Sequence, residues 1–185
     1  MFYIEVLAVL FTLLSVYLTV KKNIHCWSTG IIALIFYAII FLDARLYANL
    51  ILQGIFFIQS VYGWIVWKQE EKERPIRMWN IFQSSVYATL SGLLLIIVYY
   101  TLANYTNGNF PFMDSTATVL SLVANWALAK KYLDNWVLWI VVDIIYIVMF
   151  IMSGLYLSAI LYFILLILAV MGFKQWIKTY NEQTI

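Results

Sequence analysis

Seven long apolar runs, separated by short stretches that contain charged residues, Gly, Asn or Pro, dominate this sequence. A helix needs about 20 mostly apolar residues to cross the hydrocarbon core of a bilayer, and each run approaches or reaches that length. The mean hydropathy of +0.90 and the 65% share of hydrophobic residues lie far outside the range of a water-soluble domain. We therefore predict an all-α polytopic membrane protein with seven transmembrane helices, at 3–20, 27–42, 48–67, 82–103, 114–129, 136–152 and 155–176.

The basic residues are distributed unevenly between the predicted loops. Seven spans place all but one of the 11 lysines and arginines on the same side of the membrane, with Arg45 alone on the other. The positive-inside rule makes the lysine-rich side cytoplasmic, with the N-terminus outside and the C-terminus inside. The mixed-charge stretch "KQEEKERPIR" predicts a solvated cytoplasmic loop rather than a nucleic-acid site.

The chain repeats itself at an offset of 109 residues without gaps. "KKNIHCW" matches "KKYLDNW", and the same register pairs Gly63 with Gly172 and Trp67 with Trp176. One intervening span restores the orientation, so the two copies form parallel three-helix units in a 3+1+3 arrangement like that of SWEET transporters. The expected division is 1–68 for the first bundle, 69–113 for the charged loop and linker helix, and 114–185 for the second bundle and a cytoplasmic tail.

Residues kept in both copies are expected to serve the shared scaffold. Gly63 and Gly172 suit close helix approach, and the terminal tryptophans Trp67 and Trp176 suit aromatic belts at the lipid interface. Positions that differ in polarity between the copies are better candidates for function. These pairs are Asp143 with Leu34, Trp139 with Gly30, Asn125 with Val16, Gln53 with Tyr162, Gln59 with Leu168 and Ser60 with Ala169.

The stretch "NWVLWIVVDIIYI" places one aspartate within an apolar span. Trp136, Trp139, Asp143 and Tyr146 follow helical spacing and share one face, with Asp143 near the membrane midplane. A carboxylate there costs about 3 kcal/mol on insertion scales, so it is expected to face a protein interior or cavity. No lysine or arginine lies in a predicted span to pair with it. Three roles stay open: a carboxyl hydrogen-bonded to Tyr or Asn, a proton relay, or a counter-ion for a cationic substrate.

A second polar and aromatic face is predicted on the helix at 48–67. It contains Asn49, Gln53 and Trp64, with Gln59 at its edge, and Asn125 adds an amide on the helix at 114–129. These amides suit either interhelical hydrogen bonds or a ligand. Together with Asp143 and the tryptophans they describe a site for a small polar ring compound.

Enzyme chemistry is not expected from this composition. No second intramembrane carboxylate is predicted to pair with Asp143, since Glu5 lies near the outer end of its helix. His25 is expected in a solvated loop, and Cys26 beside it lacks the company of other metal ligands. We therefore predict a chain with no enzyme activity, no bound metal and no cofactor.

Several stretches resemble the PnuC family of bacterial vitamin transporters, the nicotinamide riboside transporters. The matching stretches span almost the whole chain apart from the charged loop and the helix at 82–103; they are "NIHCW", "DARLYANLILQ" leading into "SVYGWIVWK", "FMDSTATVLSLVANWALAKKYLDNWVLWIVVD" and "GLYLSAILYFILLILAVMGFKQW". Three patterns, YGW..W, DNW..W...D and GLYL..ILY, occur together in this sequence, and their combination is specific to the PnuC family.

The resemblance implies a trimeric protein of the bacterial plasma (inner) membrane with a 3+1+3 fold. It also implies facilitated diffusion of nicotinamide riboside, made effectively one-way by cytoplasmic phosphorylation. The pyridinium cation of this vitamin suits an intramembrane carboxylate and tryptophans. Two alternatives stay open: a carrier of thiamine or another vitamin, and a membrane binding subunit that does not transport by itself.

Overall fold

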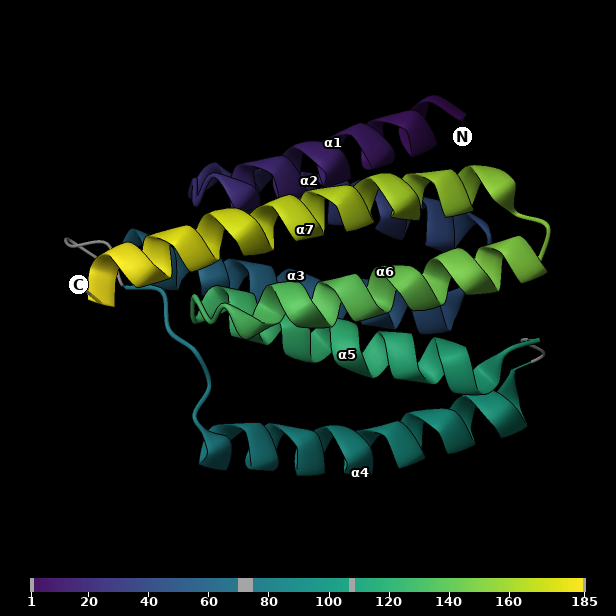
Figure 1. Ribbon diagram of the computed structural model, residues 1–185. Helices are drawn as coiled ribbons and strands as arrows, with labels where there is room; N and C mark the ends of the chain where they lie inside the picture. The colour runs from purple at the N-terminus through teal and green to yellow at the C-terminus, as the bar shows by residue number, and fades with distance from the viewer. Residues whose placement is uncertain (1, 70–74, 107–108, 185) are drawn as a thin grey trace.

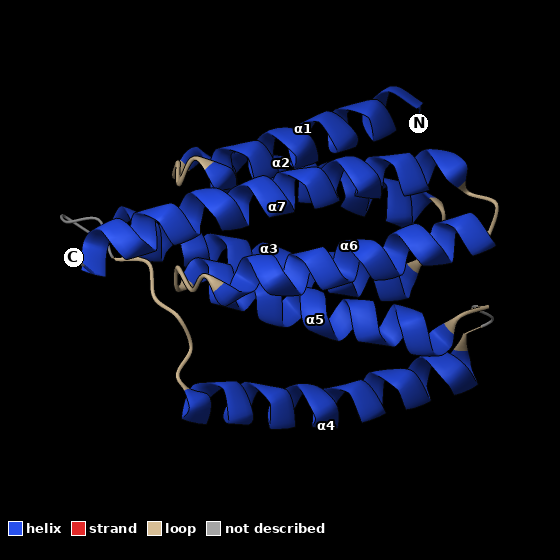
Figure 2. Ribbon diagram, in the orientation of Figure 1, coloured by secondary structure: helices blue, strands red, loops and turns tan. Residues whose placement is uncertain are grey.

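The computed structural model describes residues 2–69, 75–106 and 109–184, which contain helices and no strand (Figures 1 and 2). The helices are α1 (Phe2–Val20), α2 (His25–Asp43), α3 (Tyr47–Lys68), α4 (Ile81–Tyr105), α5 (Pro111–Ala129), α6 (Asp134–Met152) and α7 (Tyr156–Thr184). The prediction of seven helices is confirmed. The largest boundary difference is in α7, which continues to Thr184 beyond the predicted end at 176, because Ile177 and Tyr180 still pack against the buried core.

The helix α5 differs from the other six in its hydropathy. The other six are long and apolar enough to cross a membrane by length and composition, whereas α5 does not meet that measure. It packs against α3, α4 and α6, and among the described residues it has more buried residues than any other helix, including Ser115, Ser121 and Asn125. Its polar side chains therefore face protein rather than lipid, which removes the need for a uniformly apolar surface.

Six helices form a closed ring around a central space. Each packs against two ring neighbours in the order α1, α2, α3, α5, α6, α7 and back to α1. The helix α4 packs against α5 alone among the described helices, and Figure 1 shows it running along one side of the bundle. The two chain ends lie at opposite ends of the bundle, as expected for an odd number of spans.

Equivalent turns of the two copies have the same backbone geometry. Lys22 and Lys131, at the turns that follow α1 and α5, both adopt a left-handed conformation with φ of 57° and 56°. Arg45 and Gly154 do the same after α2 and α6, with φ of 58° and 72°. We call the end of the ring that carries Lys22 and Lys131 the basic end, and the end that carries Arg45 and Gly154 the opposite end.

The paired glycines allow two tryptophans to approach a neighbouring helix. A Cβ atom placed on Gly63 would lie 2.4 Å from the ring of Trp27, and one on Gly172 would lie 2.5 Å from the ring of Trp136. The expected close helix approach is confirmed. Each contact joins the second helix of a copy to the third.

Gly63→Ala is expected to lower the free energy of unfolding by about 1–3 kcal/mol, because the added methyl group must displace a large, buried ring. Gly54→Ala on the same helix is the matched control, since no heavy atom would lie within 4 Å of its Cβ. Thermal unfolding of the purified protein in detergent measures both. Equal stability of the two variants would contradict the proposed role of Gly63.

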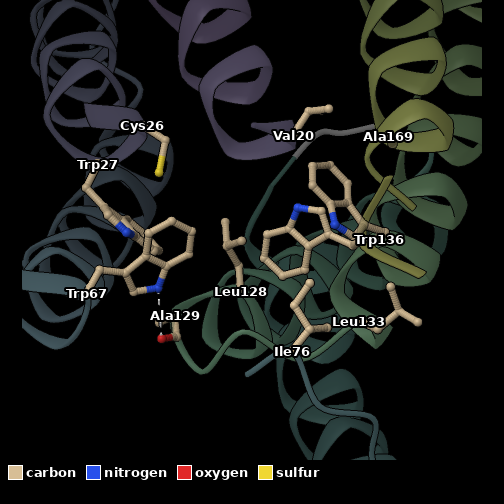
Figure 3. Close-up of a cluster of buried hydrophobic side chains, with 11 residues drawn as sticks. Val20, Cys26, Trp27, Trp67, Ile76, Leu128, Ala129, Leu133, Trp136 and Ala169 are labelled. Atoms are coloured by element: carbon tan, nitrogen blue, oxygen red, sulfur yellow. Dashed lines mark hydrogen bonds between the residues drawn. The ribbon is translucent and has the colours of Figure 1, made fainter. Parts of the chain in front are cut away.

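Four tryptophans meet inside the basic end, and we call Trp27, Trp67, Trp136 and Trp176 the tryptophan cluster. Their ring centroids are 5.6 Å apart in the pair Trp27–Trp67, 6.4 Å in Trp67–Trp176 and 5.6 Å in Trp136–Trp176. Figure 3 shows Trp27 and Trp67 on one side of Leu128 and Trp136 on the other. The rings therefore form a continuous chain of contacts between the two copies.

The prediction that Trp67 and Trp176 form belts at the lipid interface is wrong. They are 7% and 0% exposed, and each indole N–H finds a backbone acceptor in the protein. Trp67 Nε1 donates to the carbonyl of Ala129 at 3.3 Å, drawn in Figure 3, and Trp176 Nε1 donates to that of Thr19 at 3.2 Å. These bonds remove the need for an interfacial position.

The segment before α4 packs across the basic end. The loop predicted to be solvated lies partly outside the described residues, at 70–74, but its residue Ile76 is 4% exposed in the hydrophobic core, so full solvation is wrong. The backbone of Arg77 pairs with the α5–α6 turn through Lys131 and Leu133, at 3.1 and 2.8 Å. These bonds allow Ile76 to bury its side chain beside the tryptophan cluster.

Candidate functional site

A cavity of about 920 Å³ lies within the ring and reaches from the tryptophan cluster toward the opposite end. Every ring helix contributes to its lining, and α4 adds one wall near the opposite end. The volume suits a small organic ligand. Seven of the nine predicted site residues line it: Asn49, Gln53, Asn125, Trp136, Trp139, Asp143 and Tyr146.

Asp143 lies in the middle of α6 and faces this cavity. Its side chain is 3% exposed, and among the described residues it accepts no hydrogen bond and makes no ion pair. The described residues provide no hydrogen bond from a Tyr or Asn to this carboxylate, and Tyr162 lies close enough to interact with it electrostatically. A buried carboxylate without a partner is costly, so it is well placed to bind a cation.

The amides of the site fall into two groups. The Oε1 atom of Gln53 is buried and has no hydrogen-bond partner in the part of the chain that the structure describes, which leaves it available to a ligand. Asn125 Nδ2 instead donates to Gln59 Oε1 at 3.1 Å, and Gln59 Nε2 donates to the carbonyl of Leu122 at 3.2 Å. Gln59 therefore holds α3 to α5 outside the cavity lining, and it orients Asn125, which does line the cavity.

The aromatic residues also differ in their environments. Trp139 is half-buried and lines the cavity, whereas Trp136 is 1% exposed and packs against Gly172. Tyr146 lies 4.7 Å from Tyr162 between ring centroids, in a tilted pair. Trp64 is 41% exposed and lies outside the cavity lining. Of the predicted tryptophans, Trp139 is thus the most accessible stacking surface within the cavity.

Sequence reasoning missed two groups that line the cavity. Tyr162 appeared only as the apolar counterpart of Gln53 in the repeat, yet both members of that pair line the cavity. Asp114 lines it too, although it was not among the predicted site residues. The predicted span began at Asp114, which suggested a position at the membrane edge, but α5 begins earlier, at Pro111.

The charge of the cavity has one sign. Asp143 and Asp114 line it, and no Lys, Arg or His lines it among the residues that the structure describes. Among the described residues, no group of three or more His, Cys, Asp or Glu side chains is arranged to hold a metal ion. The cavity therefore offers two carboxylates, an amide oxygen and aromatic faces, a combination that favours a flat organic cation with polar substituents.

Comparison with known proteins agrees with this chemistry. The chain matches the family model described as nicotinamide mononucleotide transporter over residues 2–178. It is 30% identical over 209 aligned positions to the nicotinamide riboside transporter PnuC of Escherichia coli strain K12, covering 98% of this chain and 87% of that protein. The transporter of the same name from Neisseria mucosa is 24% identical over 139 positions, covering 68% of this chain and 51% of that one.

The fold also matches a solved structure. The crystal structure of the vitamin B3 transporter PnuC superposes with a TM-score of 0.79 at 20% sequence identity, covering 97% of this chain and 83% of that one. At this identity the match shows the fold, while the family model covers nearly the whole chain. The chain belongs to the nicotinamide mononucleotide transporter family of polytopic membrane proteins.

Proposed function

We propose that this protein transports nicotinamide riboside across the bacterial plasma membrane. The observation that carries the proposal is the pair of carboxylates, Asp143 and Asp114, in a cavity whose described lining contains no basic residue. The pyridinium ring of the riboside is a flat cation, which a carboxylate neutralises and an indole face stacks upon. The ribose hydroxyls and the carboxamide are suited to hydrogen bonds with Gln53, Asn125 and Asn49.

The charge of the cavity favours the riboside over the phosphorylated nucleotide. A phosphate group carries a charge of about −1.5 to −2 at neutral pH. Placing it beside two carboxylates, with no cation among the described lining residues to pair with it, costs several kcal/mol. A riboside phosphorylated in the cytoplasm therefore does not return through the cavity, which supports facilitated diffusion with metabolic trapping for NAD synthesis.

Thiamine is the second candidate, because it is also a flat cation that two carboxylates would attract. The names of the relatives favour the riboside. Calorimetric titration of the purified protein with nicotinamide riboside, thiamine, riboflavin and nicotinamide mononucleotide decides between them. We expect the riboside to bind most tightly and the mononucleotide not to bind. Tighter binding of thiamine would move the assignment to that vitamin.

The proposed orientation places the basic end in the cytoplasm. The N-terminus is then outside and the C-terminus inside, in agreement with the positive-inside rule. In this orientation the tryptophan cluster closes the cytoplasmic side of the cavity, and substrate enters from outside. Movement of one three-helix unit against the other would expose the cavity alternately to the two sides. A reporter fused to the C-terminus, tested for activity in the cytoplasm, checks the orientation.

We further propose a homotrimer. The helix α4 has no buried residue in the single chain, although its 25 residues are largely apolar. Such a surface is compatible with lipid and with a neighbouring subunit. The mass of the purified complex, measured by light scattering with the detergent contribution subtracted, tests this assembly.

The two indole hydrogen bonds of the tryptophan cluster are expected to hold the cytoplasmic side closed. Changing both Trp67 and Trp176 to Phe removes them, at about 1 kcal/mol each, and shifts the population toward the inward-open state by about 10- to 30-fold. The sole cysteine, Cys26, lines the cavity and is 2% exposed. Its labelling by an impermeant maleimide in inside-out vesicles reports the opening.

Trp79→Phe is the matched control for this variant. The Nε1 atom of Trp79 has no hydrogen-bond partner among the described residues, and the residue lies outside the tryptophan cluster. Labelling of Cys26 should rise in the double variant and stay at the wild-type rate in the control. An unchanged rate in the double variant would mean that these bonds do not hold the gate.

A further inference from the structure

Asp114, the second carboxylate that lines the cavity, lies near the opposite end of the ring. Asp114 is the fourth residue of α5, is half-buried and lines the cavity. Among the described residues its side chain makes no hydrogen bond and no ion pair. It lies close enough to Tyr146 and Tyr162 to interact with both electrostatically. The carboxylate thus shares a wall of the cavity with residues of α6 and α7.

The two carboxylates are separated along the direction of transport. Asp143 lies nine residues before the end of α6 at Met152, which is about 14 Å at 1.5 Å per residue. Asp114 lies three residues from the start of α5 at Pro111, or about 5 Å from the same end of the ring. A molecule that enters from the opposite end therefore meets Asp114 first, and Asp143 about 9 Å deeper.

The repeat supplies a natural comparison for Asp114. The equivalent position in the first copy is Glu5, in the first turn of α1. Glu5 is exposed and does not line the cavity, although it has the same charge and the same place in its helix. An acidic side chain in the first turn stabilises a helix N-terminus in either copy. Only in the second copy does this charge also face the cavity.

We propose that Asp114 is an outer recruiting residue, which binds the cationic substrate at the entrance and passes it inward to Asp143. The proposal rests on the proposed function, transport of a cation from the opposite end. An independent observation points to such a ligand: Asp143 is 3% exposed, makes no hydrogen bond or ion pair with any described residue, and lines the same cavity. A cavity with charge of one sign and low-dielectric walls raises the association rate of an oppositely charged substrate by about 10- to 1,000-fold.

The helix-stabilising role of Asp114 makes a different prediction from the recruiting role. Stabilisation of the α5 N-terminus affects the amount of folded protein, but it gives uptake no dependence on salt. Recruitment by an exposed or half-exposed charge weakens as salt screens it, since the Debye length falls from about 30 Å at 0.01 M to about 8 Å at 0.15 M. The salt dependence of uptake therefore separates the two roles.

The test measures initial uptake of radiolabelled nicotinamide riboside, below saturation, into liposomes that contain the purified protein. Asp114→Asn is expected to lower uptake about 10-fold at low ionic strength and to flatten its decline with salt. Glu5→Gln, which removes the matched charge outside the cavity, is expected to keep the wild-type rate and salt dependence. Asp114→Glu, which keeps the charge at the entrance, is expected to restore the decline of uptake with salt that the Asn variant loses. Asp114→Ser replaces the Asn variant if that variant does not fold.

Three outcomes would overturn the proposal. They are unchanged uptake by the Asn or Ser variant, an equal loss in Glu5→Gln, and a loss with wild-type salt dependence. A wild-type protein that neither binds nor takes up the riboside would instead overturn the proposed function on which this inference rests. Loss of binding in Asp143→Asn together with normal uptake in Asp114→Asn would overturn the recruiting role alone.

Discussion

Asp143→Asn is expected to weaken the binding of nicotinamide riboside by about 30- to 1,000-fold. Removing one partner of a desolvated charge pair costs about 2–4 kcal/mol, and each 1.4 kcal/mol is a factor of ten in the dissociation constant. Asparagine has nearly the same shape, so the change removes the charge and leaves the packing in place. Calorimetric titration of the purified variant measures the loss.

The thermal stability of Asp143→Asn provides a second test of the role of the charge. Asp143 is buried without a partner among the described residues, so its charge lowers the stability of the empty protein. Asp143→Asn should therefore unfold at the same temperature as the wild type or a higher one. Asp43→Asn, at the exposed end of α2 and outside the cavity lining, is the control and should keep wild-type affinity. Unchanged affinity in Asp143→Asn would remove the counter-ion role.

Trp139→Ala is expected to weaken riboside binding by about 5- to 100-fold with a smaller effect on folding. Stacking of a base on an aromatic side chain contributes about 1–3 kcal/mol by alanine substitution, and the positive charge of the pyridinium ring adds attraction to the indole face. Trp139 is half-buried and lines the cavity, so the change enlarges a space that a ligand occupies. Equilibrium binding and thermal unfolding of the variant separate the two effects.

Trp64→Ala is the matched control for this stacking role. Trp64 was predicted as a site residue from its place on the polar face of its helix, but it is 41% exposed and outside the cavity lining. Its replacement should leave the affinity unchanged. If Trp139→Ala and Trp64→Ala weakened binding equally, the cavity would not be the place where the ring stacks.

The apolar runs were sufficient to predict the seven helices, because an uninterrupted hydrophobic segment in a membrane has few alternatives to a helix. They did not predict where α7 ends or where α5 begins. A prediction from hydropathy ends a helix where polar residues begin. The helix α7 continues through Tyr180, because this residue packs against the core. The α5 helix begins at Pro111, a residue that suits a first helical turn.

The repeat predicted much of the cavity for a physical reason. Where two copies surround one space, the scaffold needs the same residues in both, whereas a ligand without two-fold symmetry needs different ones. Asp143 and Leu34, and likewise Trp139 and Gly30, occupy equivalent positions of the lining with different side chains. The same comparison also selected Gln59 as a site residue, although its amide forms hydrogen bonds between α3 and α5.

Tertiary packing determined what the sequence did not. The indole N–H groups of Trp67 and Trp176 bond to carbonyls that lie far away in the sequence, so no local pattern distinguishes these residues from interfacial tryptophans. The sequence also did not identify Asp114 as a site residue. Asp114 and Glu5 occupy equivalent positions in the repeat, and only the arrangement of the helices shows that Asp114 lines the cavity and Glu5 does not.

Substrate counterflow in liposomes that contain this protein alone tests the central claim most directly. Liposomes loaded with unlabelled nicotinamide riboside should transiently accumulate the labelled riboside without an ion gradient or ATP. Labelled nicotinamide mononucleotide at the same concentration should not enter, because the part of the cavity lining that the structure describes has two carboxylates and no cation. Absence of riboside counterflow, or equal exchange of the mononucleotide, would contradict a uniporter that selects its substrate by positive charge.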